Sequence, residues 1–562
     1  MKKRHINILT FLLSFLLLSC SLAACSRGTD SIGPDEGNST SSPLVGDEWE
    51  GEKEIDYKRG IFFSSAAEDG GDGSFEKPYH DLAVLPALQI PEGTCLYLER
   101  GSQFHGSLIL SGICGSEAQP VIVTSYGEGE LPKIDGNDLS GSGVVHIENC
   151  SNLVVEELEL YDSAAAEGDR RGVLITCDNN AGSREVITYR NITLRNLYIH
   201  DICGYLDAEN SGMAVSSKKT GGIQLWSNDG LGRIDGLTIT DCRIEDISNA
   251  GIATWYCLRG DSMEKISPYS SDFGKFAHRN VRIADNEISF VGKNAIFVRN
   301  LEGGVIEHNV IHDTAIGCVS GNTIVTSYVD GTVIQYNEGY RNMARPRERD
   351  GKLQDGCMLD ADLGSKNTLW QYNYSHDNAF GLFLNCTRSD GEFRDSAIVR
   401  YNLSVNDHGD QGIIYINYAS DGIEVYNNTI VTGYDTGCIL QINGGTTSSF
   451  HNNLIYNRSA AARFEIDGTG RMEVSHNLIC NEYGSTIEGA EYFLSVNQDG
   501  IFGEDPRFVG HLQEDSVPGI EKQYDYQLDT NSPALGVGKT VDADEDFFGN
   551  EYRESIGFFC GA

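Results

Sequence analysis

The sequence has little positive charge. It holds 42 Lys and Arg against 82 Asp and Glu, for a formal net charge of −40. A surface of this kind repels phosphate backbones, so nucleic acid and free polyanions are poor general partners. The sequence also lacks a Ser-His-Asp elbow, a phosphate-binding loop, a CxxC pair and any zinc-like spacing. Reactions that depend on those motifs are therefore not expected.

Helical patterning is missing from the middle of the chain. What recurs there is a short phrase, usually an Asn followed two positions later by an aliphatic residue. It begins at Leu197, Cys242, Asn286, Asn309, Asn337, Asn373, Asn402, Asn428, Asn453 and Asn477. Most steps between copies are 23 to 29 residues long. A fixed period in this range is typical of a stack of supersecondary units.

A second phrase lies between copies of the first and has the composition of a strand. It occurs at Gly222–Trp226, Gly251–Trp255, Gly356–Asp360, Gly381–Asn385, Gly412–Ile416 and Gly437–Gln441. Each copy is short, starts with Gly and is rich in aliphatic and aromatic residues. Two or three short strands per unit predict an all-β fold, a single-stranded right-handed parallel β-helix with N- and C-terminal capping segments. The repeated Asn is expected at a turn in the left-handed region, bonded to its equivalents in neighbouring coils.

The N-terminus has the pattern of an export signal. Basic residues at 2–4 precede an apolar run that ends near Leu18, and Leu22-Ala23-Ala24-Cys25 resembles a bacterial lipobox. The resemblance implies cleavage before Cys25, lipidation of its thiol and an extracytoplasmic, membrane-anchored, cell-surface protein; secretion without lipid is the alternative. The expected organisation is a signal peptide at 1–24, a flexible tether at 25–58, an N-terminal cap with first coils at 59–145, the β-helix with insertions at 146–482 and a C-terminal cap at 483–562. A monomer is expected.

Thirteen cysteines follow Cys25, and several fall inside strand phrases, for example Cys357, Cys386 and Cys438. Their number is odd and their spacing irregular. We therefore expect them to act as small buried hydrophobic residues, with disulfides left open.

Both ends of the mature chain resemble the pectate-lyase-like superfamily of right-handed β-helix proteins. The resemblance rests on Gly60–Ser65, Asp72–Ser74 and Lys77–Tyr79 near the start, on Leu131–Gly136, and on Asp505–Phe508 and Asn531–Ala534 near the end. It implies the fold and a saccharide ligand. It does not choose a reaction, because this superfamily holds lyases, hydrolases, epimerases, esterases and adhesins.

One column of the second phrase is expected to face outward. Counting from the Gly, the fourth position holds Trp226, Trp255, Asp360 and Asn385, and Arg299 occupies the matching place in its coil. Side chains two apart on a strand share a face, and coils stack about 4.8 Å apart. This column therefore predicts a sugar-binding surface.

Three long coils point to the same face, since insertions on a rigid scaffold often carry binding residues. They span Leu197–Cys242, Cys242–Asn286 and Asn337–Asn373. The third is basic and leads into a group of acids. Its candidate substrate-binding residues are Arg345 and Arg347, and His408 with Asp410 are candidates for the far wall.

Asp360 and Asp362 are the best candidates for chemistry. They lie two apart on one strand, just after Asp355. Hydrolysis of a glycosidic bond needs one protonated and one ionised carboxyl, and crowding of like charges can divide these roles. We expect Asp360 and Asp362 to act as acid and base, with Asp355 or Asp377 in support. The i, i+2 spacing favours inversion of configuration. The segment Asp355–Asn378 also resembles β-helix glycoside hydrolases and their uncharacterised relatives, although it departs from the polygalacturonase pattern.

Two other hypotheses remain. In a polysaccharide lyase, Asp355, Asp360 and Asp362 would bind Ca²⁺, and the bound Ca²⁺ would neutralise a uronate. The base would be Arg299 or Lys293, and Arg345, Arg347 or Arg349 would hold the uronate. In the other hypothesis the chain is a non-catalytic glycan-binding or structural surface protein. The preferred prediction is a glycoside hydrolase with no cofactor and a polysaccharide or oligosaccharide substrate.

Overall fold

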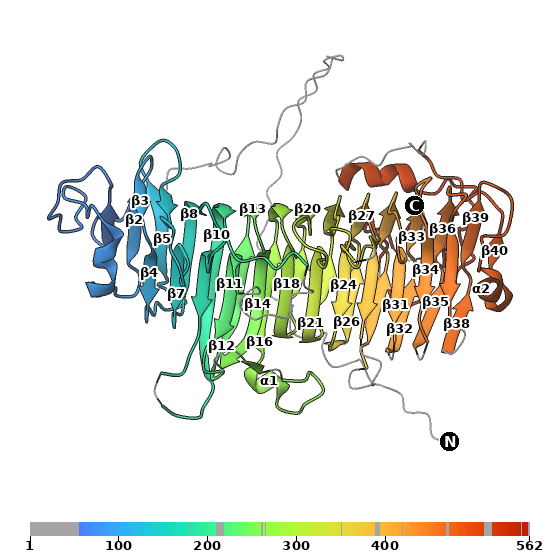
Figure 1. Ribbon diagram of the computed structural model, residues 1–562, viewed down its shortest axis with the longest axis horizontal. Helices are drawn as coiled ribbons and strands as arrows, with labels where there is room; N and C mark the ends of the chain where they lie inside the picture. The colour runs from blue at the N-terminus through green and yellow to red at the C-terminus, as the bar shows by residue number, and fades with distance from the viewer. Residues whose placement is uncertain are drawn as a thin grey trace, which may run out of the picture. The chain divides into compact units, whose positions relative to one another are not determined.

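The computed structural model describes residues 55–562 except 181, 210–218, 260–261, 265, 350, 388–393, 419, 445, 468–470, 511–519, 544, 552 and 560–562. Its strands stack side by side in one long solenoid (Figure 1). Almost every strand pairs in parallel with the equivalent strand of the next coil, so three series of pairings run along the molecule. We call them sheets A, B and C, in the order in which each coil passes through them.

Sheet A contains β1 (Gly60–Phe63), β2 (Cys95–Glu99), β5 (Val121–Tyr126), β8 (Leu153–Asp162), β10 (Ile187–Ile202), β12 (Gly232–Thr240), β16 (His278–Ala284), β19 (Val305–Glu307), β22 (Val333–Gln335), β26 (Thr368–Gln371), β29 (Ala397–Arg400), β32 (Asp421–Tyr426), β35 (Thr447–His451) and β38 (Arg471–Ser475). The long strands β8 and β10 turn a corner and continue into sheet B.

Sheet B continues with β3 (Gln103–His105), β6 (Lys133–Asp135), β13 (Arg243–Ile247), β17 (Glu287–Val291), β20 (Val310–Thr314), β23 (Glu338–Tyr340), β27 (Tyr374–His376), β30 (Leu403–Val405), β33 (Thr429–Val431), β36 (Leu454–Asn457), β39 (Leu478–Asn481) and β40 (Ile501–Phe502).

Sheet C contains β4 (Leu108–Ser111), β7 (Val145–Glu148), β9 (Arg171–Thr176), β11 (Gly221–Ser227), β14 (Ala250–Arg259), β18 (Ile296–Glu302), β21 (Ile324–Asp330), β24 (Leu359–Asp362), β28 (Phe383–Cys386), β31 (Ile414–Asn417), β34 (Cys438–Ile442) and β37 (Arg463–Ile466). Two short strands flank this sheet, β15 (Ser262–Glu264) against β14 and β25 (Ser365–Lys366) against β21. The predicted second phrase therefore forms the strands of sheet C.

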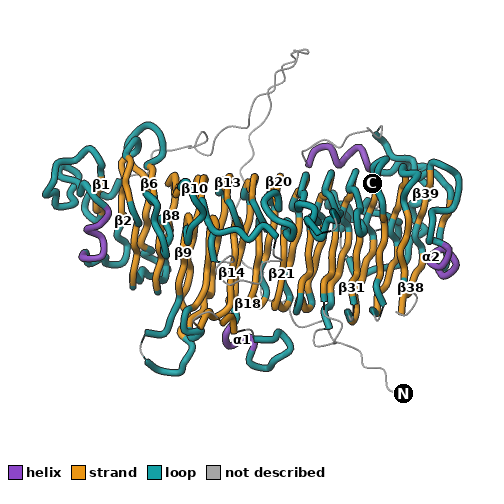
Figure 2. Tube along the Cα trace, viewed as in Figure 1, coloured by secondary structure: helices purple, strands orange, loops and turns teal. Residues whose placement is uncertain are grey.

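Helices are few and peripheral among the described residues (Figure 2). They are the 3₁₀ segments η1 (Leu82–Ala87) and η3 (Ile520–Tyr526) and the short α-helices α1 (Phe273–Phe276) and α2 (Glu491–Val496). No helix among the described residues has the length and apolar character needed to cross a membrane. The candidate lipidation site, Cys25, lies outside the described residues, as do the predicted signal peptide and most of the tether.

The core is a set of aliphatic stacks inside the solenoid. In sheet C one inward column holds Ile223, Ile252, Ile296, Ile324 and Leu359, each at most 1% exposed. Each coil alone would leave this apolar face in water, and stacking removes it at about 25 cal/mol per Å². The strands of sheet C thus show the predicted alternation of inward and outward side chains.

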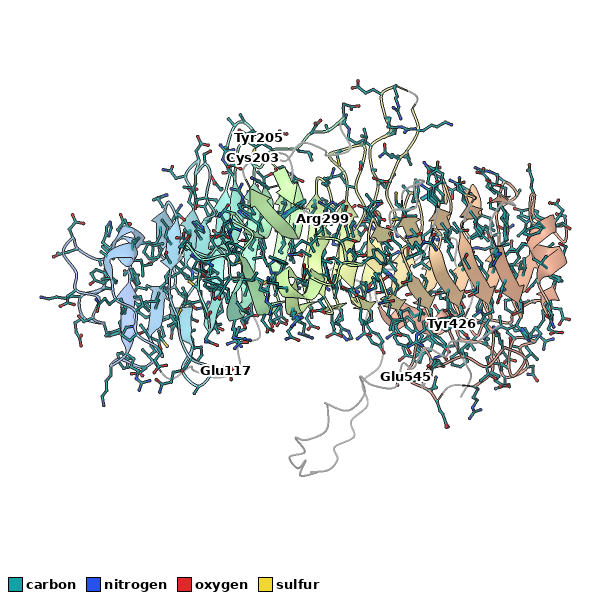
Figure 3. All side chains as sticks on the ribbon, turned by 90° about the horizontal axis from the view of Figure 1, so that it is seen from below. Glu117, Cys203, Tyr205, Arg299, Tyr426 and Glu545 are labelled. Atoms are coloured by element: carbon teal, nitrogen blue, oxygen red, sulfur yellow. The ribbon has the colours of Figure 1, made fainter. Side chains whose placement is uncertain are left out.

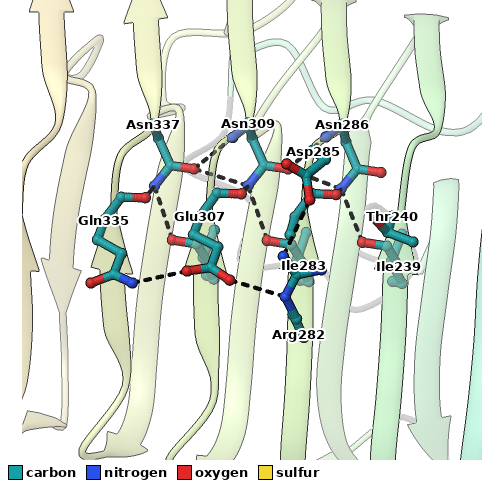
Figure 4. Close-up of polar contacts among 12 residues, drawn as sticks. Ile239, Thr240, Arg282, Ile283, Asp285, Asn286, Glu307, Asn309, Gln335 and Asn337 are labelled. Atoms are coloured by element: carbon teal, nitrogen blue, oxygen red, sulfur yellow. Dashed lines mark hydrogen bonds and ion pairs between the residues drawn. The ribbon is translucent and has the colours of Figure 1, made fainter. Parts of the chain in front are cut away.

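The recurring Asn forms a buried ladder at the corner between sheets A and B (Figure 4). Asn286 Nδ2 donates to Asn309 Oδ1 at 2.9 Å, and Asn309 Nδ2 donates to Asn337 Oδ1 at 2.9 Å. Each amide also donates to backbone carbonyls, as Asn309 does to Ile283 at 3.0 Å. The predicted bonding between neighbouring coils is confirmed. It continues without a break to Asn497.

The expected left-handed backbone is one residue away from where it was predicted. The residues with positive φ are those just before each ladder Asn, with φ of 52° to 58°: Asp285, His308, Tyr336, Tyr372, Tyr401, Asn427, Asn452 and His476. This residue makes the corner, and the Asn that follows turns inward. Its amide then satisfies backbone carbonyls that the corner would leave unpaired.

The end of the solenoid is closed by two parts of the C-terminal segment. Phe493 of α2 packs against Phe450 and Phe464 and covers the last coils. The chain then returns along the flank of the solenoid, where Phe547 and Phe558 join a buried cluster with Tyr372, Tyr374, Tyr401 and Tyr426. Eleven cysteines of the described residues are free thiols, seven of them buried, which matches their expected role as small apolar residues.

Candidate active site

Sheet C places Asp360 and Asp362 on its outer side. In β24, Leu359 and Ala361 point into the core and are fully buried, so the two aspartates between and after them point outward. Asp360 pairs with Val325 on one side and Leu384 on the other, and Asp362 pairs with Cys386. The predicted shared orientation of the two carboxyls is present.

Asp360 is buried and only 6% exposed. Its Oδ2 accepts a hydrogen bond of 2.7 Å from Asn322 Nδ2, while Oδ1 has no partner among the described residues. Asn322 is held in turn by the backbone N–H groups of Gly356 and Cys357, which donate to its Oδ1. Burial, followed by the charges of Asp362 and Asp355, raises the pKa of Asp360 well above its ordinary value.

Asp355 lies in the loop just before β24 and is half-buried. Burial is the main cause that raises its pKa, and the charge of Asp362 acts in the same direction. A hydrogen bond from the Ser320 side chain and the charge of Lys293 oppose the rise in pKa. Lys293 is itself 8% exposed, so this cation is part of the site.

Asp395 is a fourth carboxyl that the sequence analysis did not single out. It is fully buried, and its Oδ1 accepts hydrogen bonds from the Gly364 backbone N–H at 3.0 Å and from the Tyr269 hydroxyl at 3.3 Å. Burial and the charge of Asp362 raise its pKa to about 8. No sequence signal marks it, because Asp395 stands alone before β29 and Tyr269 is 126 residues away in another coil.

Asp362 influences all three of the other carboxyls. It appears among the causes that raise the pKa of Asp355, Asp360 and Asp395, and it is half-buried. Four like-charged groups in one place cannot all ionise at neutral pH. The arrangement therefore favours the protonated forms of Asp355, Asp360 and Asp395, whose pKa values are raised.

Asn385 does not face outward, contrary to prediction. It pairs with Ala361, is fully buried in the core and donates from Nδ2 to the Ala361 carbonyl at 3.1 Å. The phrase at Gly381 reaches its strand one residue earlier than the phrase at Gly356, so Leu384, not Asn385, lies beside Asp360. A shift of one residue moves every side chain to the other face.

Trp226, Trp255 and Arg299 are on the outer side of sheet C but are not open to a ligand. They are 6%, 2% and 7% exposed, and both indoles belong to a small apolar cluster with Phe297 and Val325. The Arg299 guanidinium lies over the Phe297 ring at 3.9 Å and over Trp255 at 4.8 Å. Figure 3 shows Arg299 over the strands of the middle coils. Stacking of the two indoles on sugar rings is not possible in this conformation.

Asp377 does not join the carboxyl cluster. It follows β27 on sheet B, where His376 Nδ1 bonds to its Oδ2 at 2.9 Å. His376 is fully buried between the rings of Tyr340 and Tyr374. The equivalent pairs His200–Asp201 and His312–Asp313 form the same contact in earlier coils, at 2.8 and 2.7 Å. Asp377 is thus part of a repeated architectural pair.

The remaining candidates lie in the loops before β24 and β31. Arg345 is exposed. Burial raises the pKa of the nearby Cys318 thiol; the charge of Asp355 adds to that rise, and the charge of Arg345 opposes it. Arg347 is half-buried in the same insertion, where its backbone N–H donates to the Lys352 carbonyl. His408 bonds to Asp435 at 2.9 Å at the corner before β31, with Asp410 exposed beside it.

Among the described residues, no group of three or more His, Cys, Asp or Glu side chains is arranged to hold a metal ion. The carboxyl cluster instead has the features of a proton-transfer site: neighbouring acids, strong burial of two of them, and one nearby cation.

Comparison with known proteins supports the fold. Residues 221–430 match the family model described as a right handed beta helix region, which confirms the predicted handedness. The crystal structure of the GH136 lacto-N-biosidase from Eubacterium ramulus superimposes with a TM-score of 0.54 at 22% identity, over 74% of this chain and 67% of that one. The complex of XylC with xylose gives a TM-score of 0.50 at 11% identity, over 89% and 98% of the two chains.

A sequence relative is also found. The lacto-N-biosidase of Bifidobacterium longum subsp. longum is 26% identical over 585 aligned residues, which cover 87% of this chain. The chain spans about a third of the length of that relative, 35%. The chain is thus similar, over most of its length, to a carbohydrate-active enzyme.

Proposed function

We propose that the protein is a glycoside hydrolase that acts on an oligosaccharide at the outer face of sheet C. The observation that carries this proposal is the cluster of Asp355, Asp360, Asp362 and Asp395, in which burial, and then the charge of Asp362, raises the pKa of the other three carboxyls. Cleavage of a glycosidic bond needs a protonated and an ionised carboxyl side by side. The similarity to lacto-N-biosidases makes lacto-N-biosidase activity the first to test.

The roles of the carboxyls follow from their burial. Asp355 and Asp362 are half-buried and can reach a substrate, whereas Asp360 is buried at 6% exposure. Asp355 would donate its proton to the glycosidic oxygen as the bond to the anomeric carbon breaks. The ionised Asp362 would stabilise the positive charge on that carbon, either by bonding to it or by taking a proton from an attacking water. Burial and the charge of Asp362 would keep Asp355 protonated.

The test is hydrolysis of a lacto-N-biose-terminated oligosaccharide by the Asp355→Asn and Asp362→Asn variants. Each should lower kcat by about 10²- to 10⁴-fold, because each removes one half of the acid–base pair. Asp377→Asn is the matched control, since it changes an acid of sheet B, and should retain activity. Full activity of Asp362→Asn would overturn the proposal.

A calcium-dependent lyase remains the second candidate, because Lys293 lies beside Asp355 in the manner of a base next to a uronate site. Lyase products would absorb in the ultraviolet through a new double bond, and a chelator would abolish activity. We expect new reducing ends, no such absorbance and no effect of chelator.

We further propose attachment to the outer side of a membrane through Cys25, which rests on the lipobox resemblance alone. Cell fractionation tests this point. The Cys25→Ser protein should leave the membrane fraction, and its retention there would contradict the anchor.

A further inference from the structure

Past the carboxyls, the outer face of sheet C carries two amide side chains beside a small apolar cluster. The next outward position after Asp362 is Cys386 in β28, followed by Asn417 at the end of β31 and then by Asn443 just after β34. Tyr415 stands in the neighbouring outward column, where it pairs with Gln441. These outward columns also carry a small buried apolar cluster, in which Leu384 and Tyr415 pack with Phe380 and Cys386 lies against them.

Three of these side chains form one hydrogen-bonded group. Asn443 Nδ2 donates to the Tyr415 hydroxyl at 2.8 Å and to Asn417 Oδ1 at 3.0 Å. Both amide hydrogens of Asn443 are used in this way, so its Oδ1 is left to accept. The Tyr415 hydroxyl accepts one bond and keeps its own hydrogen to donate, and Asn417 Nδ2 keeps its hydrogens as well. Within the described part of the chain, these three side chains make no other hydrogen bond.

The two amides of this group are accessible, whereas the ring of Tyr415 is buried at 8% exposure. Asn417 and Asn443 are half-buried, and Tyr418, the next residue after Asn417, is 42% exposed. Tyr418 is held at a positive φ of 57°. An exposed ring beside a fixed set of donors and acceptors suits a sugar, which offers hydroxyl groups along its edge and an apolar C–H face.

The spacing sets the length of the ligand. Because coils stack about 4.8 Å apart, Asn417 and Asn443 lie two and three coils from Asp362, roughly 10 and 14 Å along the face, about the length of a disaccharide. We propose that Asn417 and Asn443, the latter positioned by the Tyr415 hydroxyl, form a saccharide subsite that binds the sugar one residue removed from the bond that is cleaved. The inference rests on the proposed hydrolase function and adds where the substrate lies: it extends from the carboxyls towards the C-terminal coils.

The test is isothermal titration of the protein with lacto-N-biose. Tyr415→Phe removes only the hydroxyl, and Asn417→Ala removes only one amide. Each should weaken binding by about tenfold, the effect of losing one hydrogen bond in a formed site. The matched control is Glu424→Ala, an exposed residue of β32 on sheet A, which should bind as the wild type does. Thermal melting of every variant checks that the fold is intact.

Binding measurements test the subsite, and hydrolysis measurements test the catalytic assignment, so the two proposals can be rejected separately. Binding of lacto-N-biose to both variants with unchanged Kd would overturn the subsite, whatever the activity of the enzyme. Absence of binding to the wild type would overturn it equally as a disaccharide site. Hydrolysis by Asp362→Asn would instead overturn the catalytic assignment. Weaker binding by both variants, together with a raised KM and a kcat within twofold of wild type on a longer oligosaccharide, supports the subsite.

Discussion

At the scale of single residues, the site depends on which carboxyls hold protons. Asp395 is the clearest case, because it is fully buried yet accepts hydrogen bonds from Gly364 and Tyr269 that suit an acceptor oxygen. Those bonds lower its pKa, but burial outweighs them and raises it to about 8. Folding therefore costs Asp395 its charge, and this cost depends on pH.

The pH dependence of stability tests that statement. The ordinary pKa of 3.8 rises to about 8 on folding. The contribution of Asp395 to the free energy of unfolding is thus fully present below about pH 4 and is lost as the pH rises towards 8. An Asn at this position has no charge to lose. The free energy of unfolding of Asp395→Asn should therefore exceed that of wild type by an amount that grows from pH 5 to pH 8. At about 1.4 kcal/mol per unit of pKa shift, the difference should reach a few kcal/mol.

Chemical denaturation at pH 5 and at pH 8 measures this difference in the free energy of unfolding. Glu424→Gln is the control, since Glu424 is exposed and should show no such gain. An equal pH dependence of the Asp395→Asn and wild-type proteins would show that Asp395 is ionised in the folded state.

At the scale of elements, close approach of successive coils holds β24, β28 and β31 in register. A Cβ atom on Gly381, the residue that leads into β28, would lie 2.3 Å from the Cα of Ile413 in the next coil. No side chain fits at that distance, and the obstacle is backbone that cannot rotate away. This glycine therefore sets the spacing directly beneath the carboxyl cluster.

Replacement of Gly381 by Ala should cost about 1–3 kcal/mol of unfolding free energy, as expected for overpacking in a tight core. It should also reduce activity, because β28 would move relative to Asp360 and Asp362. The matched control is Gly437→Ala, where the nearest atoms are the end of the Arg463 side chain and the Gly409 carbonyl oxygen, both at 3.4 Å, an ordinary contact distance. Denaturation midpoints of the two variants measure the difference, and equal midpoints would show that the coils have room to shift.

At the scale of the whole molecule, the C-terminal segment is a brace as well as a cap. Phe547 and Phe558 pack against each other at 5.2 Å, and Tyr372 donates to the Glu545 carbonyl at 3.1 Å. Figure 3 shows Glu545 close to the flank that carries Tyr426. The brace thus contacts coils on both sides of the one that carries Asp395.

Solenoids unfold in local blocks, so removal of the brace should act locally. Phe558 is 1% exposed, and Phe558→Ala should cost about 3–5 kcal/mol in the coils that it covers. Hydrogen exchange should become faster in β26, β29 and β32 while β10, β12 and β14 keep their protection. Uniform loss of protection along the chain would show that the solenoid unfolds as a single unit.

The sequence by itself determined the repeat, its period and the strand character of the second phrase, because stacking coils imposes the same inward pattern on each copy. It also placed Asp360 and Asp362 on one face, since side chains two apart on a strand must share it. Only the tertiary structure decided the inward turn of Asn385, the burial of Trp226 and Trp255, and the entry of Asp395 into the site. The reason is register: the distance from the leading Gly to the strand varies by one residue between coils, and contacts such as Tyr269 with Asp395 join positions 126 residues apart. A local pattern contains neither quantity.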